Sequence, residues 1–460
     1  MSSSSRSGGS FRDPSGFLFV RDGTLYRQIN QIYRPSYDQL IDSGLYAELV
    51  ALGCLIPHES AATPPAEPAT ASLVIQPEPV PFISYPYEWS FSQLQDAALI
   101  TLEIQQRALK RGLSLKDASA YNIQFHRGRP LLIDTLSFEP YPEGEPWVAY
   151  RQFCQHFLAP LAIMSLRDIR LGQLLRLHID GVPLDLAARL LPRRSRLRVG
   201  LLTHLHLHAV SQKRFAGAEV RSTERRGRVS RIGFLGLIDS LRRTVAGLRW
   251  EPGRTDWAEY DRMHNYSAAA QADKRRIVGE YLDRARPASL WDLGANTGEF
   301  SRLASSRGIS TIAFDVDPSA VEANYLSVRR EGEKSLLPLL MDLTNPSPAQ
   351  GWRHEERQAL VARGPADAVM ALALVHHLAI GNNVPLPQLA AFLAALGRWL
   401  IIEFVPKSDS QVRRMMAARE DIFTDYTLEG FERDFGVYFA LRQRDEIAES
   451  GRTLYLWEKR

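Results

Sequence analysis

A short apolar run that ends in an acid and a glycine-rich turn limits the fold of this chain more than any other feature of its sequence. Leu290-Trp291-Asp292-Leu293 is typical of a buried strand, and Gly294 and Gly298 frame the turn before the next helix. Glycine lets the backbone approach a ligand where a Cβ atom would clash. In an open α/β sheet, ligands bind outside the carboxyl ends of the strands. The pattern therefore predicts a ligand-binding strand–turn–helix unit.

Strand-like and helix-like runs alternate from about residue 256 to residue 460. Such alternation predicts a mostly parallel sheet with helices on both faces, so the expected fold class is α/β with a Rossmann-like sheet. A helix is expected over Ser319–Val328. The expected strands are Ser289–Leu293, Thr311–Asp315, Ser335–Met341, Asp367–Leu374 and Trp399–Phe404.

Three further strand ends carry polar residues suited to a small ligand. Asp315 ends its strand, and a carboxylate there can accept hydrogen bonds from both hydroxyls of a ribose. Asp317 is expected to cap the helix that follows. Asp342 ends the next strand, and His376-His377 ends the one after it. The carboxyl ends of parallel strands share one edge, so these residues are expected to surround one site.

The four elements, in this order, resemble the motifs of class I S-adenosylmethionine (SAM) dependent methyltransferases. The loop from Asp292 to Gly298 is similar to motif I, which wraps the amino-acid part of SAM and lacks the third glycine of a dinucleotide site. The resemblance implies methyl transfer, a ribose contact for Asp315 and an adenine contact for Asp342. It assigns to SAM the residues Asp292, Gly294, Ala295, Asn296, Gly298, Asp315, Val316, Asp342, Leu343 and Ala371.

Residues that act on the methyl acceptor are expected where the last two strands end. His376 and His377 titrate near neutrality in their ordinary state, which suits a general base, although packing explains each equally well. Glu403 could orient the acceptor, but a helix cap or an ion pair with Lys407 explains it slightly better. No metal is expected, because the chain has two cysteines and the run His204–His208 has no acid or cysteine neighbour. A small molecule, a protein and RNA are all candidate methyl acceptors.

A second resemblance appears between Phe11 and Ser165. Asp117 and Asn122 lie five apart after an amphipathic helix expected at Ser92–Arg111, and a hairpin then ends in Asp134. This spacing is similar to the catalytic loop and metal-binding acid of protein kinases and aminoglycoside phosphotransferases. The resemblance implies an α+β kinase-like domain in which Asp117, Asn122 and Asp134 hold Mg–ATP.

The kinase pattern is incomplete in this chain. Leu115-Lys116 stands where kinases have His-Arg, Thr135-Leu136 follows Asp134, and no glycine-rich phosphate loop is present. We therefore expect a degenerate module that binds or orients the substrate. The alternative is a bifunctional methyltransferase and ATP-dependent phosphotransferase. A purely structural role, with Asp117 capping a turn and Asp134 paired with an arginine, also fits.

The expected organisation has four parts. The serine-rich residues 1–10 are expected to be a disordered tail. Residues 11–165 form the kinase-like domain, with strands at Gly16–Val20 and Thr24–Ile29, a helix at Tyr37–Leu52 and a proline-rich loop insertion at 57–86. Residues 166–250 are a helical, basic continuation of that domain, and residues 256–460 are the methyltransferase domain.

Charge and composition limit the partners. The net charge is +4, and residues 189–249 hold fifteen Lys/Arg against three acids. Such a run can attract phosphate-bearing partners such as nucleic acid by counterion release, although a solvated helical surface explains it better. A non-enzymatic SAM- or RNA-binding protein is therefore a further alternative. Two cysteines and no apolar stretch of spanning length predict a cytoplasmic protein with no membrane partner.

The two halves together resemble a group of bacterial proteins that includes the nodulation protein NoeA and uncharacterised methyltransferases. The segments Pro86–Ser90 and Glu403–Lys407 carry this likeness. It implies methyl transfer without specifying the acceptor.

Overall fold

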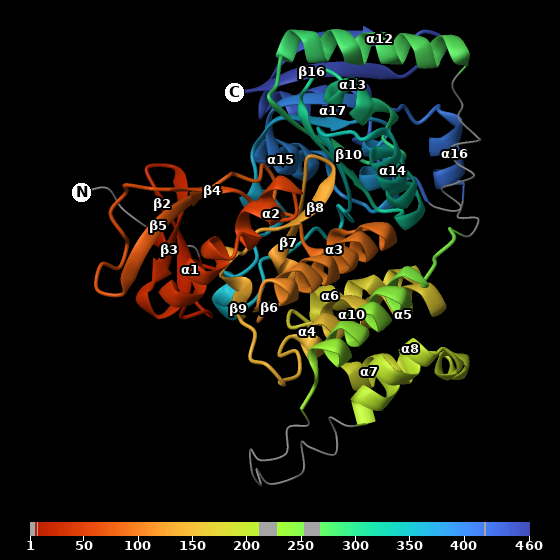
Figure 1. The fold of residues 1–460 in the computed structure, drawn as a ribbon. Coiled ribbons are helices and arrows are strands. Elements are labelled where there is room, and N and C mark those ends of the chain that lie inside the picture. Colours follow the sequence, from red (N-terminus) through yellow and green to blue (C-terminus); the bar gives the residue numbers. More distant parts are fainter. Residues whose placement is uncertain (1–4, 7, 211–227, 253–266, 418–419) are drawn as a thin grey trace. The chain divides into compact units, whose positions relative to one another are not determined.

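The computed structural model describes residues 5–6, 8–210, 228–252, 267–417 and 420–460 (Figure 1). The chain forms two compact units. Unit 1 comprises Met1–Glu251 together with Gly351–Arg357, and unit 2 comprises Pro252–Gln350 together with Gln358–Arg460. Among the described residues, no helix combines the length and the apolar character needed to cross a bilayer.

Unit 2 is built on a seven-stranded sheet in the order β12-β11-β10-β13-β14-β16-β15. The first five strands run parallel, and the last two add an antiparallel edge. The expected Rossmann-like α/β sheet is therefore confirmed. The strands are β10 (Ser289–Leu293), β11 (Ser310–Asp315), β12 (Leu336–Leu340), β13 (Ala366–Ala371), β14 (Gly397–Phe404), β15 (Phe439–Glu446) and β16 (Thr453–Lys459).

Helices cover both faces of this sheet. Side chains alternate between the two faces along each strand, so each face packs against its own set of helices. Leu290, Met370 and Ile401 pack against α12 and α13 on one face, where Ala313 also meets α14. On the other face α15 lies against β13 and β14, and Phe431 of α17 packs against Phe404. The helices are α12 (Ala268–Ala285), α13 (Glu299–Ser305), α14 (Pro318–Glu331), α15 (Leu386–Leu396), α16 (Ser410–Met416) and α17 (Leu428–Gly436).

One strand ends earlier than the sequence pattern predicts. The expected strand Asp367–Leu374 closes at Ala371 in β13. The chain then leaves the sheet, and Ala373 takes a left-handed conformation with φ +50°. A left-handed alanine is sterically unfavourable, so the surrounding structure must hold it. Apolar residues continue to Leu374 because they line a cavity. Residues that line a cavity and residues buried in a sheet are both apolar, so the sequence pattern does not distinguish them.

Unit 1 contains a five-stranded antiparallel sheet in the order β1-β2-β3-β5-β4, followed by a long helix α3 (Phe91–Lys110) and a mostly helical second half. This agrees with the expected α+β organisation. The strands are β1 (Ser5–Arg6), β2 (Gly16–Arg21), β3 (Thr24–Asn30), β4 (His58–Ser60), β5 (Ala71–Pro77), β6 (Leu113–Leu115), β7 (Ile123–His126), β8 (Arg129–Leu132) and β9 (Phe138–Pro140).

The proline-rich insertion at 57–86 was predicted as loop, and that prediction is wrong for β4 and β5. β5 pairs with β3, and β4 pairs with β5 as the edge strand. The prolines do not prevent this, because Pro57 precedes β4 and Pro77 ends β5, where no ladder hydrogen bond is lost. Long-range pairing with β3 therefore overrides the local composition.

Two further predictions for unit 1 need correction. Within the expected disordered tail, Ser5–Arg6 pairs with β2, whereas residues 1–4 and 7 lie outside the described residues. The single helix expected at Tyr37–Leu52 is two helices, because Gly44 takes a left-handed φ of +74° between them. Those helices are α1 (Arg34–Asp42) and α2 (Leu45–Ala51).

The second half of unit 1 is helical, as expected for the basic region. Its longest described helix, α10, packs against α3. The basic run is described only in part, because residues 211–227 lie outside the described residues. The helical segments are α4 (Tyr150–Phe153), η5 (Cys154–Leu158), α5 (Ala159–Leu166), α6 (Leu174–Leu177), α7 (Leu184–Leu190), η7 (Arg193–Leu197), α8 (Val199–Leu201), η8 (Leu202–Leu207) and α10 (Arg231–Ala246).

Candidate functional site

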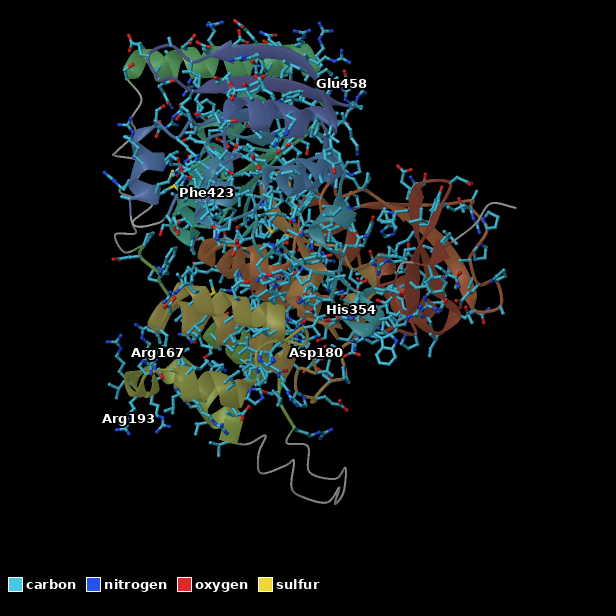
Figure 2. The ribbon with its side chains drawn as sticks, turned by 180° about the vertical axis from the view of Figure 1, so that it is seen from behind. Arg167, Asp180, Arg193, His354, Phe423 and Glu458 are labelled. Atoms are coloured by element: carbon cyan, nitrogen blue, oxygen red, sulfur yellow. The ribbon has the colours of Figure 1, made fainter. Side chains whose placement is uncertain are left out.

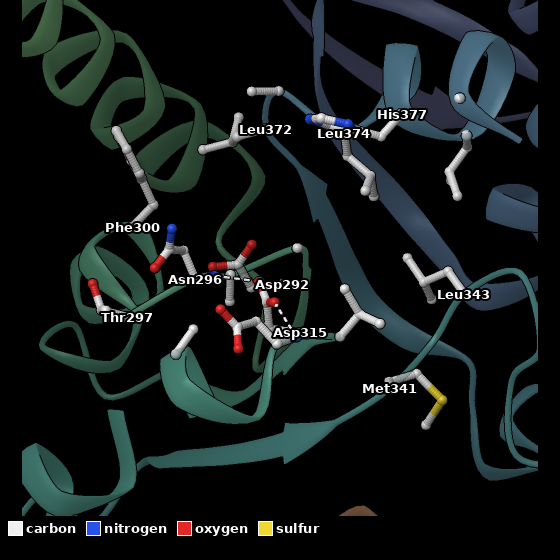
Figure 3. A pocket seen from close by; sticks show the side chains of 18 of the residues that line it. Asp292, Asn296, Thr297, Phe300, Asp315, Met341, Leu343, Leu372, Leu374 and His377 are labelled. Atoms are coloured by element: carbon white, nitrogen blue, oxygen red, sulfur yellow. Dashed lines mark hydrogen bonds between the residues drawn. The ribbon is translucent and has the colours of Figure 1, made fainter. Parts of the chain in front are cut away.

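A cavity of about 660 Å³ opens in unit 2 at the carboxyl ends of β10, β11, β12 and β13 (Figure 3). This is the edge of a parallel sheet at which ligands bind. The predicted residues that line the cavity are Asp292, Gly294, Ala295, Asn296, Asp315, Val316, Asp342, Leu343 and His377. Four other predicted residues do not line it: Gly298, Ala371, His376 and Glu403.

The loop after β10 bends sharply around one end of the cavity. Gly294 and Asn296 have φ values of +76° and +49°, and both line the cavity. Gly298, with φ +85°, has a different role. A Cβ atom there would lie 2.5 Å from Asn324 Nδ2 and 2.8 Å from Arg302 Nη1, so this glycine lets α13 approach α14. The motif thus serves both the cavity and the packing beside it.

Asp315 is bound to the same loop. Its carboxylate accepts hydrogen bonds from the backbone N–H of Asn296 at 2.7 Å and of Asp317 at 2.9 Å, and Figure 3 draws hydrogen bonds at this carboxylate. Burial raises the pKa of Asp315 above its ordinary value, although these backbone bonds oppose the rise. Asp317 accepts from the Ser319 N–H and caps α14, which confirms that prediction. Two oxygens, each with a fixed orientation, therefore face the cavity from β11.

Asp292 lies at the floor of the cavity with 2% of its surface exposed. Its carboxylate accepts a 2.6 Å hydrogen bond from the Ser301 hydroxyl. Burial raises the pKa of Asp292 to about 7, more than the Ser301 bond lowers it. A cation placed in the cavity would favour the ionised form of this carboxylate.

The other end of the cavity combines aliphatic walls with one carboxylate. Val316, Met341 and Leu343 line it. Asp342 accepts hydrogen bonds from the Thr344 N–H at 2.9 Å and the Thr344 hydroxyl at 2.6 Å. Apolar side chains beside a hydrogen-bond acceptor suit a flat heterocycle with an amino group.

The two histidines after β13 have different positions. His377 lines the cavity, whereas His376 is fully buried behind it, with ring centroids 4.2 Å apart. Neither His376 ring nitrogen has a hydrogen-bond partner among the residues that the structure describes. Burial lowers the pKa of His377 to about 4, and it lowers the pKa of His376 well below its ordinary value. Both rings are therefore neutral at pH 7.

Glu403 is part of a buried ion network. It is 0% exposed, and its carboxylate lies 2.7 Å from Lys274 Nζ and 3.2 Å from Arg452 Nη1. Arg452 also bonds to Asp409 at 2.9 Å. The alternative partner Lys407 pairs with Asp421 instead. Lys274 and Arg452 line the cavity while Glu403 does not, so Glu403 acts on the cavity through these two cations.

Several cavity residues escaped the sequence analysis. Lys274 had a usable signal, because it interrupts the apolar face of α12 between Ala270 and Ile277. Gln411 and Met415 of α16 had none, because only the tertiary fold brings that short helix to the strand ends. The remaining unpredicted lining residues are Gln271, Thr297, Glu299, Phe300, Asp317, Ala320, Met341, Thr344, Leu372, Ala373, Leu374, Leu378, Gly381 and Arg452.

In unit 1, the structure brings Asn122 and Asp134 together. The Ser137 hydroxyl donates to Asp134 at 2.7 Å, and Asn122 Nδ2 donates to Ser137 Oγ at 3.4 Å. Asp134 also forms an ion pair with the Arg27 guanidinium. Burial raises the pKa of Asp134 and the Arg27 charge lowers it, and the net pKa lies below its ordinary value.

Asp117 is the third residue of this group, and its carboxylate is hydrogen-bonded to other groups of unit 1. Its carboxylate accepts from the Ser119 N–H at 2.9 Å and from Gln152 Nε2 at 2.8 Å. Burial, and then the Asp134 charge, raise its pKa. The capped turn and the arginine pair match the structural alternative for Asp117 and Asp134. Among the residues that the structure describes, no cluster of His, Cys, Asp or Glu has the geometry of a metal site.

One known protein is similar to this chain over nearly its whole length. The chain is 38% identical over 466 aligned residues to the "Nodulation protein NoeA" of Rhizobium meliloti (strain 1021), covering 99% of this chain and 96% of that protein. No protein-family model matches.

Solved structures resemble only part of the chain. WbdD is 16% identical over 44% of this chain, with a TM-score of 0.31, and the match spans 42% of WbdD. The magnesium protoporphyrin IX methyltransferase ChlM of Synechocystis PCC 6803 is 15% identical over 46% of this chain and 90% of its own, with a TM-score of 0.30. The N-methyltransferase NodS of Bradyrhizobium japonicum WM9 is 11% identical over 42% of this chain and 98% of its own, with a TM-score of 0.31.

Proposed function

This chain belongs to the family of the nodulation protein NoeA, and on that premise we propose that it transfers a methyl group from SAM to an acceptor bound beside His377. The observation that carries the proposal is the cavity at the carboxyl ends of β10 to β13. Its volume of about 660 Å³ lies within the range of small-molecule sites. Ordered strand-end residues, among them Gly294, Asp315 and Asp342, line it together.

The residues present fit SAM. Backbone N–H groups occupy part of the Asp315 carboxylate, and its two oxygens would accept the ribose hydroxyls at the lone-pair sites that remain. The open loop from Gly294 to Asn296 would hold the amino-acid part, and Asp342 with Leu343 the adenine. When bound, SAM supplies a methyl group that its sulfonium charge has already activated.

The chain's own residues would then orient the acceptor. His377 is a weak base, because its pKa is about 4. It therefore serves better as a neutral hydrogen-bond partner than as a proton acceptor. Glu403 is a positioning residue, since it acts through Lys274 and Arg452. The proposal thus gives His377 a role in alignment, where the sequence left a general-base role and a packing role equally open.

Calorimetry with SAM and its demethylated product tests the proposal. We expect wild-type protein to bind both ligands and Asp315→Ala to bind at least tenfold more weakly, because two charge-assisted hydrogen bonds are lost. Asp283→Ala is the matched control, since its carboxylate is 65% exposed and pairs with Arg307 on the surface. If the wild type and Asp315→Ala both fail to bind, or bind equally, the proposal is wrong.

The acceptor requires a separate experiment. Incubation of a cell extract with methyl-labelled SAM and the protein would reveal whether label enters protein, RNA or small molecules. Label transfer that depends on wild-type protein and disappears with Asp315→Ala is the expected result. SAM binding without any transfer would favour the non-enzymatic alternative.

For unit 1 we propose a binding role toward the substrate. The Arg27 guanidinium neutralises Asp134, which is the carboxylate that the kinase resemblance assigns to Mg²⁺. Mg²⁺ could bind Asp134 only by displacing the buried Arg27 guanidinium. The free-energy cost of that displacement would make metal binding weaker here than at an exposed carboxylate. The geometry therefore gives no specific support to phosphoryl transfer.

A further inference from the structure

One helix of unit 1 buries two histidines beside Leu201 and Leu205 and leaves other aliphatic side chains exposed. The helical run from Val199 to Val210, through α8 and η8, buries His204 and His206, which are 1% and 7% exposed. The same run leaves Leu207 and Val210 more than half exposed, at 56% and 53%. The exposure of Leu207 and Val210 leaves unused the free energy that burial of an aliphatic side chain provides.

The internal contacts fix this orientation. His204 hydrogen-bonds to the Tyr150 hydroxyl through Nδ1 and to the Ser240 hydroxyl through Nε2, each at 2.8 Å. Gly200 lies so close to α10 that a Cβ atom there would be 2.8 Å from Thr244 Cγ2. These contacts hold the helix with Leu207 and Val210 on its exposed side.

The exposed aliphatic residues form a row along the helix. Val199, Leu207 and Val210 are 78%, 56% and 53% exposed, and Thr203 between them is also exposed. Their spacing of four, four and three residues places them on one helical face. Leu197, just before the helix, is 85% exposed.

Arginines flank this row. Arg193, Arg194, Arg196 and Arg198 are all exposed, and Figure 2 shows Arg193 projecting outward from its helical segment. The Ser195 hydroxyl bonds to His206 at 2.8 Å, which holds η7 beside η8. Among the described residues, none of these four arginines forms an ion pair, and the sequence has no acid from residue 186 to residue 210. We call these four arginines with Leu197, Val199, Leu207 and Val210 the basic–aliphatic patch.

We propose that the basic–aliphatic patch docks on the surface of a membrane that contains anionic lipids. Aliphatic side chains enter the boundary between headgroups and acyl chains, and arginines pair with lipid phosphates. Nucleic acid fits less well, because single strands favour aromatic stacking platforms and the patch has no aromatic residue. The sequence-based expectation of no membrane partner rested on the lack of a spanning segment, which surface docking does not need.

Flotation of the full-length protein with lipid vesicles tests this. We expect binding to phosphatidylcholine vesicles that contain phosphatidylserine, little binding to phosphatidylcholine alone, and release by added salt. Replacing all four arginines by glutamine should weaken binding by about fivefold for each arginine. Leu197→Gln with Leu207→Gln should weaken it by tenfold or more.

Control variants separate the patch from general charge and apolar surface. Leu177→Gln on α6, 76% exposed, and Arg330→Gln on α14, with its side chain 72% exposed, should bind like wild type. Circular dichroism checks that every variant is folded. The proposal is overturned if wild type does not bind anionic vesicles, or if patch variants bind like wild type. It is equally overturned if the arginines are needed for RNA but not for vesicles, or if the leucines are needed only for self-association.

Discussion

Lys274 Nζ lies 2.7 Å from Glu403 Oε2, and the two side chains are only 5% and 0% exposed. Lys274 comes from α12 and Glu403 from the end of β14, so this ion pair ties α12 to the sheet. Arg452, next to β16, contacts the same carboxylate. Three elements thus converge on one buried acid directly behind the cavity.

Removing Glu403 should therefore destabilise unit 2. Glu403→Gln leaves Lys274 and Arg452 buried without their common anion, and we expect a loss of about 3–5 kcal/mol in the free energy of unfolding. Lys407→Met breaks a surface pair and should cost less than about 1 kcal/mol. Urea denaturation measures both. Equal costs for the two variants would show that the buried network has no special role.

SAM affinity should depend on the ionisation of Asp292. The pKa of Asp292 is about 7, and a cationic ligand favours its ionised form, so binding below pH 7 must release a proton. Affinity should therefore fall as the pH drops from 8 to 6. Calorimetry in buffers of different ionisation enthalpy measures the released proton, and Asp292→Asn should abolish the dependence. An affinity that rises on acidification would contradict the assignment.

The two left-handed glycines Gly298 and Gly308 make a matched pair. Gly298→Ala adds both strain and a clash with Asn324, whereas Gly308→Ala, at φ +80° in open space, adds strain only. We expect a cost of about 1–2 kcal/mol for Gly308→Ala and about 1–3 kcal/mol more for Gly298→Ala. Thermal denaturation checks the order. Gly308→Ala should retain wild-type SAM affinity, since Gly308 does not line the cavity.

Buried histidines should make the fold sensitive to acid. Burial lowers the pKa of His156 to about 3 and those of His58, His204 and His377 to about 4, from 6.5 in the unfolded chain. The unfolded state then binds more protons between pH 6.5 and 4, so stability is present above 6.5 and is lost as the pH falls through this window. Denaturation midpoints measured from pH 7.5 to 4.5 test this. His156→Gln should flatten the slope, and an unchanged slope would argue against the burial of His156.

Unit 1 should not respond to Mg–ATP. Arg27 neutralises Asp134, so we expect no thermal shift and no ATP hydrolysis by wild-type protein. Arg27→Leu should lower the melting temperature, because it leaves a buried carboxylate without its cation. Arg34→Leu, in an exposed i,i+4 pair, is the control with little expected effect. A wild-type thermal shift that Asp117→Asn removes would instead support the phosphotransferase alternative.

The sequence by itself determined the parallel sheet of unit 2 and the order of its strand-end residues. These follow from local signals, because apolar strands, glycine turns and helix caps such as Asp317 depend on residues near them in the chain. All five expected strands form, and Asp292, Gly294, Asp315 and Asp342 flank one cavity. The early end of β13 was missed because lining a cavity and packing in a sheet require the same apolar residues.

Only the tertiary structure decided which distant groups meet. Glu403 contacts Lys274, more than a hundred positions away in the sequence, and Arg452, about fifty positions away. Asp134 contacts Arg27, also more than a hundred positions away. No periodic pattern encodes such pairs, because they depend on how packed elements cross. The run His204–His208 makes the same point. Its period places His204 and His208 on one face, and contacts with Tyr150 and Ser240 turn that face inward, whereas Leu207 and Val210 stay exposed.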